Sequence, residues 1–401
     1  MAELNAWHRF FSRFIRRLYF ERITVIDADG LPRQGPALYV GLHRNGAVDG
    51  LVYQEALPRA VFLISSQLRR SRLGRLFFSG IAVTRPQDAA PGSAPADNAG
   101  ALRACLEHLA AGGELCVFPE GTSSLGPRHL PFKSGAARLC LSARERRIPL
   151  FLVPVAVFYQ EPTAFRASVE VVIGDPIDAE APPGSPLSRL REVKRRIAEG
   201  LEALGTNVAD AEVQEDIQRL ASAAAIGARR SYWRSLKALE RGIPPETRDV
   251  WQRLEPELAR PGLRLEQGLP PFPEAGLLLP ALGLALSAPL VLGAIALNLP
   301  PYAAAWWAGR RFPDGRNVVS LWKILVGVPA FLLWAALLTA AALAACPWAA
   351  LGYAVLTGAG LWLYSRTRRL AKAVNNGLRH PDLAPALHSL RRALQEELRD
   401  A

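Results

Sequence analysis

Cysteine is scarce in this chain, and its placement excludes two kinds of architecture. The 401 residues include four cysteines, at positions 105, 116, 140 and 346. They show neither the paired spacing of a disulfide framework nor the clustered spacing of a zinc site. Such isolated thiols fit a reducing compartment, where disulfides are rare.

The chain also lacks a recognisable secretory signal and has fewer acidic than basic residues. Its opening segment has no clean apolar core followed by a small-residue cleavage site. Lysine and arginine number 48 against 36 aspartate and glutamate residues, which gives a formal net charge of +12. Nucleic-acid binding would require a basic stripe with base-stacking aromatics on a soluble face. Here the basic residues flank apolar ones, so the sequence favours a bilayer with anionic lipids as a partner, and no nucleic acid.

The first twenty residues combine cations with aromatic side chains. Residues 7–20 interleave arginine with tryptophan, phenylalanine and tyrosine at helical spacing. This pattern predicts an amphipathic helix over residues 1–20 that lies at a membrane interface. The alternative is an ordinary surface helix whose arginines face water.

Apolar runs alternate with helical patterns in the first half of the chain. Strands are expected at residues 36–42, 60–65, 81–84, 114–118, 150–158 and 168–173, and helices at 49–57, 67–79, 98–111 and 133–144. Strands that alternate with helices imply a layered fold. The sequence therefore predicts an α/β domain over residues 21–184.

The second half is expected to be helical, and its end is much more apolar. Residues 185–273 carry charged amphipathic patterns and close with a proline-rich linker, which predicts a helical extension. Residues 274–365 contain long apolar stretches, and a bilayer core needs only about 20 such residues. They are predicted to be membrane-embedded helices, followed over residues 366–401 by a basic and then polar cytosolic tail.

The arginine and lysine clusters decide which membrane topology we expect. Three simple spans would place two of these clusters against the tendency of positive charge to stay on the cytoplasmic side. Two α-helical hairpins keep every cluster cytosolic. One would turn near Pro289 or Asn298, and the other near Cys346.

Two polar motifs follow predicted strands, and together they indicate chemistry. His43 ends one apolar run, Asp49 stands about one turn into the next helix, and Glu120 follows a later strand. A carboxylate can keep one imidazole nitrogen protonated while the other nitrogen takes a proton from a hydroxyl. No serine or cysteine adjoins His43, so we expect the hydroxyl to belong to a substrate. This arrangement predicts direct acyl transfer.

At these motifs the sequence resembles the glycerolipid acyltransferase superfamily, which includes glycerol-3-phosphate and 1-acylglycerol-3-phosphate acyltransferases. Four blocks match in order, at residues 43–49, 80–85, 118–122 and 152–155, and Lys133 lies in a stretch that resembles the family's Lys-x-Gly. The resemblance implies an O-acyltransferase of phospholipid biosynthesis. In it, His43 is the general base and Asp49 orients the imidazole.

The resemblance also implies the residues that bind substrate. Arg85 and Lys133 are expected to approach the acceptor phosphate, and the planar fork of arginine suits a tetrahedral anion. Glu120 would help to arrange the acceptor site, while Gly121 and Thr122 would bring backbone N–H groups close to the anion. No metal or cofactor is expected, because the thioester of acyl-CoA or acyl carrier protein carries the leaving group.

Ser123 leaves the acceptor open. It stands where many lysophosphatidate enzymes carry arginine, and a missing guanidinium removes a bidentate phosphate contact. We expect glycerol 3-phosphate or 1-acylglycerol 3-phosphate as the acceptor, at a membrane and with the active site facing the cytoplasm. The alternatives are an acyltransferase for another lyso-lipid, either a lysophospholipid or a lyso-aminolipid, and a non-catalytic lipid-binding membrane protein.

Overall fold

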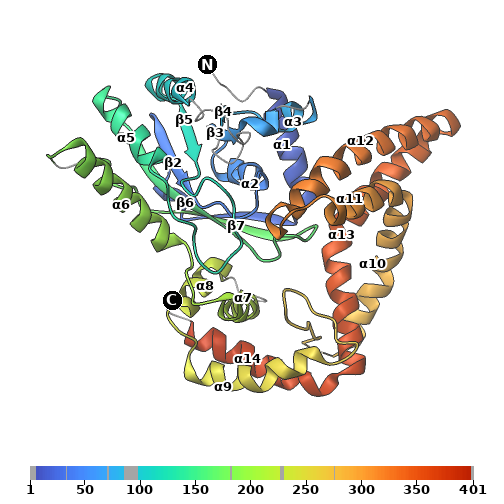
Figure 1. The fold of residues 1–401 in the computed structure, drawn as a ribbon. Helices are drawn as coiled ribbons and strands as arrows, with labels where there is room; N and C mark the ends of the chain where they lie inside the picture. Colours follow the sequence, from blue (N-terminus) through green and yellow to red (C-terminus); the bar gives the residue numbers. More distant parts are fainter. Residues whose placement is uncertain are drawn as a thin grey trace. The chain divides into compact units, whose positions relative to one another are not determined.

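The computed structural model describes residues 6–32, 34–69, 72–84, 98–180, 183–225, 230–274 and 276–398 (Figure 1). The chain forms two compact units. The first, named here the sheet unit, comprises the chain up to Asp210 together with Asp314–Leu321. The second, named the helical unit, comprises Ala211–Pro313 and the chain from Trp322 onward.

The sheet unit is built on a seven-stranded sheet with the order β1-β7-β6-β2-β5-β3-β4. All neighbouring strands are parallel except β6 and β7, which are antiparallel. The six predicted strands are confirmed, and β1 is an addition that the sequence did not predict. The strands are β1 (Arg22–Ile26), β2 (Ala37–Gly41), β3 (Ala60–Ser65), β4 (Ile81–Val83), β5 (Glu114–Val117), β6 (Phe151–Tyr159) and β7 (Ser168–Ile173).

Helices cover both faces of this sheet. α2 packs on one face, while α4, α5 and α6 form a layer on the other (Figure 1). The predicted helices are confirmed, except that the segment expected at 67–79 is divided between a short 3₁₀ turn and α3. The helices are α1 (Ala6–Tyr19), α2 (Val48–Ala56), α3 (Arg72–Phe77), α4 (Ala99–Ala110), α5 (Gly135–Glu145) and α6 (Pro186–Leu204).

The sheet unit extends past the boundary that we expected at residue 184. α6 begins at a serine cap, where the Ser185 side chain accepts a hydrogen bond from the Ser188 N–H. Its apolar face, which includes Val193, Ile197 and Leu201, is buried, and the helix packs on α5 and β6. Because the sheet needs cover on this face, α6 belongs to the α/β layer and not to the helical extension.

The centre of the sheet sets the place of the functional site. Every residue of β2 is buried, as is every residue of β5, which fits strands covered on both faces. The two strands are parallel neighbours, with Val40 opposite Val117. Parallel strands deliver the loops that follow them to the same sheet edge. The motif that contains His43 therefore lies beside the motif that contains Glu120.

The helical unit consists of amphipathic helices followed by long apolar ones. Two of its segments, Leu278–Leu297 and Arg316–Ala345, are long and apolar enough to cross a membrane by length and composition, although the first residues of the latter belong to the sheet unit. The helices are α7 (Ala211–Ala225), α8 (Tyr232–Glu240), α9 (Pro245–Leu254), α10 (Leu278–Leu297), α11 (Leu299–Arg311), α12 (Val319–Ala345), α13 (Pro347–Arg379) and α14 (Ala384–Glu397).

The pairing of the apolar helices differs from the two expected hairpins. α10 continues through Pro289, so a turn at that residue is wrong, but helices do end at Asn298, the other position expected for that turn, and at Cys346, as expected. α10 packs along α13 in the antiparallel direction, with Gly283 beside Leu370 at one end. At the other end the Asn298 side-chain amide donates a 3.1 Å hydrogen bond to the Thr357 hydroxyl.

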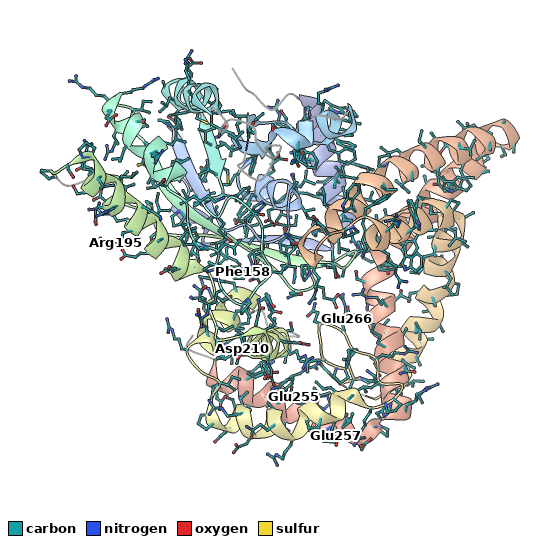
Figure 2. All side chains as sticks on the ribbon, in the orientation of Figure 1. Phe158, Arg195, Asp210, Glu255, Glu257 and Glu266 are labelled. Carbon is teal, nitrogen blue, oxygen red and sulfur yellow. The ribbon has the colours of Figure 1, made fainter. Side chains whose placement is uncertain are left out.

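The segment that we expected to be a cytosolic tail is an integral part of the helical unit. α13 continues to Arg379, and α14 packs on α7 and α9 through buried Leu387, Leu390 and Leu394. Glu266, labelled in Figure 2, forms ion pairs with Arg368, at 2.5 Å, and with Lys372. The carboxylate is almost fully buried, so these basic side chains offset a charge that would otherwise be costly to bury.

Candidate active site

The centre of the candidate site is a histidine paired with a buried aspartate. His43 lies in the loop between β2 and α2, and its Nδ1 is 2.8 Å from Oδ2 of Asp49 in the first turn of α2. The Asp49 side chain is 0% exposed and that of His43 is 14% exposed. Since a carboxylate only accepts, Nδ1 carries the proton, and the second ring nitrogen, Nε2, holds a lone pair that can act as a base.

Asp49 is held by more donors than the histidine alone. Its Oδ2 accepts hydrogen bonds from the backbone N–H groups of Arg44, at 2.6 Å, and Asn45, at 2.9 Å, and Oδ1 accepts one from the Tyr159 hydroxyl at 2.6 Å. Burial, and then the charge of Asp49, raises the pKa of Tyr159 well above its ordinary value, which keeps this phenol a donor. Tyr159 was missed by sequence reasoning. The available signal was its place at the end of the predicted strand at 150–158.

Glu120 connects the two motifs through the backbone. Its Oε1 accepts a 3.1 Å hydrogen bond from the His43 N–H, and Oε2 accepts a 3.4 Å bond from the Leu130 N–H. In return, the Ser124 N–H donates to the His43 carbonyl at 3.0 Å. Glu120 is 1% exposed, and burial raises the pKa of its carboxyl group. The carboxylate therefore lies against the backbone of the histidine loop and is not among the residues that line the adjoining cavity.

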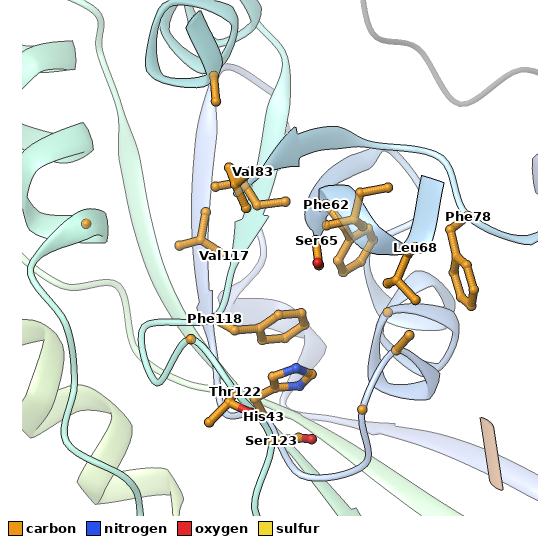
Figure 3. Close-up of a pocket in the computed structure, with 18 of the residues that line it drawn as sticks. His43, Phe62, Ser65, Leu68, Phe78, Val83, Val117, Phe118, Thr122 and Ser123 are labelled. Carbon is orange, nitrogen blue, oxygen red and sulfur yellow. The ribbon is translucent and has the colours of Figure 1, made fainter. Parts of the chain in front are cut away.

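An aromatic ring supports the imidazole. The ring of Phe118 stacks on that of His43, with centroids 4.3 Å apart and planes 9° from parallel. Figure 3 shows the two rings one above the other, with Thr122 and Ser123 beside the imidazole. The second motif thus fixes the base both through its backbone and through this stack.

The histidine opens onto a cavity of about 850 Å³. Polar groups line it around His43, and they include Thr122, Ser123 and Lys133. The remainder is largely apolar, with Phe62, Leu68, Phe78 and Val83 on the far side of Phe118 in Figure 3. A cavity that is polar around His43 and apolar farther away suits a ligand with a polar head and a hydrocarbon chain.

Lys133 and Gly121 lie together at the polar end. Gly121 has a φ of 73°, and a Cβ at this position would come 2.5 Å from Nζ of Lys133. A side chain here would therefore be strained and would displace the ammonium group. The Gly121 N–H already donates to the Phe118 carbonyl at 3.0 Å. Arg85, the other expected phosphate-binding residue, lies outside the described residues.

A further wall of the cavity comes from Asp314–Leu321, which is distant in sequence. Asn317 in this segment donates from Nδ2 to the Ser123 carbonyl oxygen at 3.0 Å and to the Ser123 Oγ at 2.6 Å. Sequence reasoning missed Asn317 because 194 positions separate it from Ser123. Within the described ranges, no three His, Cys, Asp or Glu side chains gather so as to hold a metal ion.

The profile of the acyltransferase family matches residues 22–158, which run from the start of β1 to the last residue but one of β6. These residues form a domain of the glycerolipid acyltransferase superfamily. The acyltransferase domain contains His43, Asp49, Glu120 and Lys133. Tyr159 and Asn317, which hold the site from its margins, lie outside the matched range.

Two comparisons with known proteins give similar chains. The chain is similar to glycerol-3-phosphate O-acyltransferase 1 of Saccharomyces cerevisiae, with 29% identity over 127 residues that cover 29% of this chain and 17% of the yeast protein. The chain thus spans less than a fifth of that relative. A comparison of structures finds the 1-acyl-sn-glycerophosphate (LPA) acyltransferase PlsC of Thermotoga maritima, with 18% identity, a TM-score of 0.36, and coverage of 51% of this chain and 83% of that chain.

Proposed function

We propose that this protein is a membrane-bound O-acyltransferase of phospholipid biosynthesis. It transfers a fatty acyl group from an acyl thioester to the hydroxyl of glycerol 3-phosphate or 1-acylglycerol 3-phosphate. The observation that carries this proposal is the 2.8 Å contact between His43 Nδ1 and buried Asp49, at a cavity with a polar and an apolar part. The family of the domain supports the same reaction class.

The geometry supports a reaction without a covalent enzyme intermediate. Nε2 of His43 takes the proton of the acceptor hydroxyl as its oxygen attacks the thioester carbonyl carbon. The tetrahedral intermediate then breaks its C–S bond, and the leaving thiolate takes the proton back from His43. An ester and a free thiol are the products. Asp49 holds the required tautomer and stabilises the imidazolium during the step.

The substrate-binding roles follow the arrangement at the polar end of the cavity. Lys133 and Arg85 would offset the charge of the acceptor phosphate, with Gly121 and Thr122 beside it. Glu120 would arrange the acceptor site by fixing the backbone of His43. The donor would be acyl-CoA or acyl carrier protein. No metal or further cofactor is required, because the thioester already supplies an activated carbonyl.

The exposed apolar surface supports the membrane part of the proposal. The two candidate spans are only 17% and 11% buried within their most apolar windows, so most of their side chains are partly or fully exposed. In the sheet unit, α1 exposes Trp7 and Phe10 beside its arginines while Phe11 and Ile15 are buried. This pattern suits a helix at the surface of an anionic bilayer. We place the active site at the cytoplasmic side, and we propose no nucleic-acid partner.

Ser123 gives a second acceptor class specific support. It lines the cavity with a hydroxyl, which leaves the site with less positive charge than a guanidinium would supply. Another lyso-lipid, either a lysophospholipid or a lyso-aminolipid, is therefore the alternative acceptor. A non-catalytic lipid-binding protein is less well supported, because it would have no use for an imidazole base held by a buried carboxylate.

The test is an acceptor panel with membranes that contain the full chain. Glycerol 3-phosphate, lysophosphatidate, lysophospholipids and lyso-aminolipids are each offered with a labelled acyl thioester. We expect transfer to at least one of the first two acceptors, and a fall of about 10²- to 10⁴-fold in His43→Ala, since general-base catalysis contributes about that much. His380→Ala in the helical unit is the matched control. Undiminished turnover by His43→Ala would disprove the mechanism.

A further inference from the structure

The orientation of the Asn317 amide is fixed by chemistry. Its Nδ2 lies 3.0 Å from the backbone carbonyl oxygen of Ser123, and a carbonyl oxygen can only accept a hydrogen bond. If the amide were rotated by half a turn, its oxygen would face another oxygen. The nitrogen is therefore the atom that faces Ser123.

The same nitrogen decides how the Ser123 hydroxyl is used. Nδ2 of Asn317 also lies 2.6 Å from Ser123 Oγ. Because an amide nitrogen is only a donor, Oγ must accept this bond. The hydrogen of the hydroxyl is then left to donate elsewhere, and Ser123 lines the cavity beside His43, Thr122 and Lys133.

Asn317 can act in this way because its segment is anchored at other points of the sheet unit. Ser320 donates from Oγ to the Pro162 carbonyl at 2.7 Å, and its oxygen accepts from the Tyr19 hydroxyl at 3.0 Å. The Asn45 side chain donates to the same Pro162 carbonyl at 2.8 Å. These bonds tie the segment Asp314–Leu321 to the loop that carries His43.

Close packing adds to these hydrogen bonds. A Cβ at Gly46 would come 3.1 Å from the Asn317 carbonyl oxygen and 3.3 Å from a methyl carbon of Val318. The segment thus lies against the loop of the histidine on one side and is bonded to Ser123 on the other. It leaves little freedom for either of the loops that form the polar end of the cavity.

From this arrangement we infer that Asn317 is a positioning residue, which directs the hydroxyl of Ser123 to donate to the phosphate group of the acyl acceptor. The inference rests on the proposed acyltransferase function. A hydroxyl whose lone pair is engaged by an amide presents its hydrogen to an anion, and hydrogen bonds to charged groups are stronger than neutral ones. Ser123 would thus take over part of phosphate recognition, at a position fixed by a residue 194 positions further along the chain.

The test measures the kinetics of Ser123→Ala, Asn317→Ala and the double variant, in the full chain, with glycerol 3-phosphate and with lysophosphatidate. We expect each single variant to raise the KM for the phosphate-bearing acceptor about tenfold, the effect of one hydrogen bond to a charged group. The double variant should be no worse than the more impaired single variant, because both changes remove the same interaction. The KM for the acyl thioester should stay within about twofold of the wild-type value, since the proposed contacts of Ser123 and Asn317 do not involve the thioester.

Three measurements separate this role from a merely structural one. Asn317→Asp keeps the size of the side chain but replaces the donor, so it should raise the acceptor KM at least as much as Asn317→Ala does. Asn375→Ala, which removes a 3.1 Å amide bond to the Gly262 carbonyl in the helical unit, is the matched control and should leave both KM values unchanged. Thermal melting of each variant reports whether it is folded.

Several results would overturn the inference while acyl transfer itself stands. They are a normal acceptor KM in folded Asn317→Ala or Asn317→Asp, single effects that multiply in the double variant, or wild-type turnover confined to acceptors without phosphate. An enzyme that transfers no acyl group to any acceptor would instead refute the proposed function, and this inference with it.

Discussion

The two units of the molecule treat polar and apolar side chains in opposite ways. In the sheet unit the carboxylate of Asp49 in the candidate active site is 0% exposed, and its two oxygens receive four hydrogen-bond donors. In the helical unit large apolar side chains are the exposed ones, among them Leu278 at 81%, Leu333 at 74% and Trp348 at 77%. Soluble surfaces rarely carry apolar patches of this extent. The sheet unit thus buries a carboxylate among donors at the candidate site, whereas the helical unit exposes large apolar side chains on its long helices.

The two units therefore depend on different interactions. The candidate active site depends on the number of donors around the buried Asp49 carboxylate, since an unsatisfied buried group is costly. The apolar helices carry large uncovered side chains, and in the proposed membrane-bound protein the bilayer would remove these side chains from water. A single polar substitution should therefore damage catalysis in the first unit and membrane association in the second.

The largest effect should come from Asp49→Asn. The amide would present a donor where the carboxylate accepts from the Arg44 and Asn45 N–H groups or from Tyr159, and it would no longer hold the correct histidine tautomer. We expect a loss of acyl transfer of about 10²- to 10⁴-fold and a loss of about 1–3 kcal/mol in stability. Initial rates with a labelled thioester and thermal melting measure the two effects. Asp249→Asn, at an exposed position, is the control and should behave as wild type. Near-normal rates in Asp49→Asn would contradict the proposal that the buried carboxylate holds His43 in the state needed for acyl transfer.

A smaller effect is expected on membrane association, where the same substitution in each unit should give different results. Leu333→Arg places a charge on the exposed apolar face of α12, while Leu187→Arg makes the same change at a residue of α6 that is also exposed. Arginine near the centre of a membrane helix costs about 2.5–3.5 kcal/mol by insertion measurements. We expect Leu333→Arg to shift the protein from the membrane to the soluble or aggregated fraction, and Leu187→Arg to leave it in place. Equal fractionation of the two variants would show that the exposed helices do not require lipid.

The smallest effect should be a change in the pH dependence of stability caused by Glu120. Burial raises the pKa of this carboxyl group above its ordinary value of 4.5. The folded state therefore holds the proton of Glu120 more tightly than the unfolded state does. The resulting contribution to folding stability is fully present below pH 4.5 and is lost as the pH rises through the raised pKa. Between pH 4.5 and the raised pKa, the wild type should lose stability relative to Glu120→Gln. Above that range the two curves of stability against pH should run parallel.

Melting temperatures of the purified protein across this pH range check the prediction. The exposed Glu246→Gln should follow the wild-type curve at every pH. Curves for wild type and Glu120→Gln that stay parallel throughout would mean that Glu120 does not titrate in the way its burial implies.

The sequence predicted the centre of the sheet well but missed the edge strand β1. β2, β5 and β6 are buried almost throughout, and two-sided burial leaves a continuous apolar run that is easy to identify. β1 has intermediate or exposed residues at every position and pairs with β7, which is far along the chain. Its five residues carry no periodic signal of their own, so its place in the sheet depends on a partner that local patterns cannot indicate.

The same limit applies to the site and to the apolar helices. His43, Asp49 and Glu120 could be predicted because each belongs to a short motif next to a strand end. Asn317 could not, since its role exists only when a distant segment closes on Ser123. For the apolar helices, composition indicates length but not the neighbour, which explains why the packing of α10 on α13 was not foreseen. The role of Arg85 stays a prediction.

The flat stack of His43 on Phe118 restricts the direction from which a proton can leave or arrive. The lone pair of an imidazole nitrogen lies in the plane of its ring, and here one broad side of that ring is covered by a benzene ring at 4.3 Å. Under the proposed mechanism, an alcohol that donates its proton to Nε2 would approach along the ring plane, away from the corner held by Asp49. The attacking oxygen of that mechanism would thus be directed along one line before it reaches the thioester.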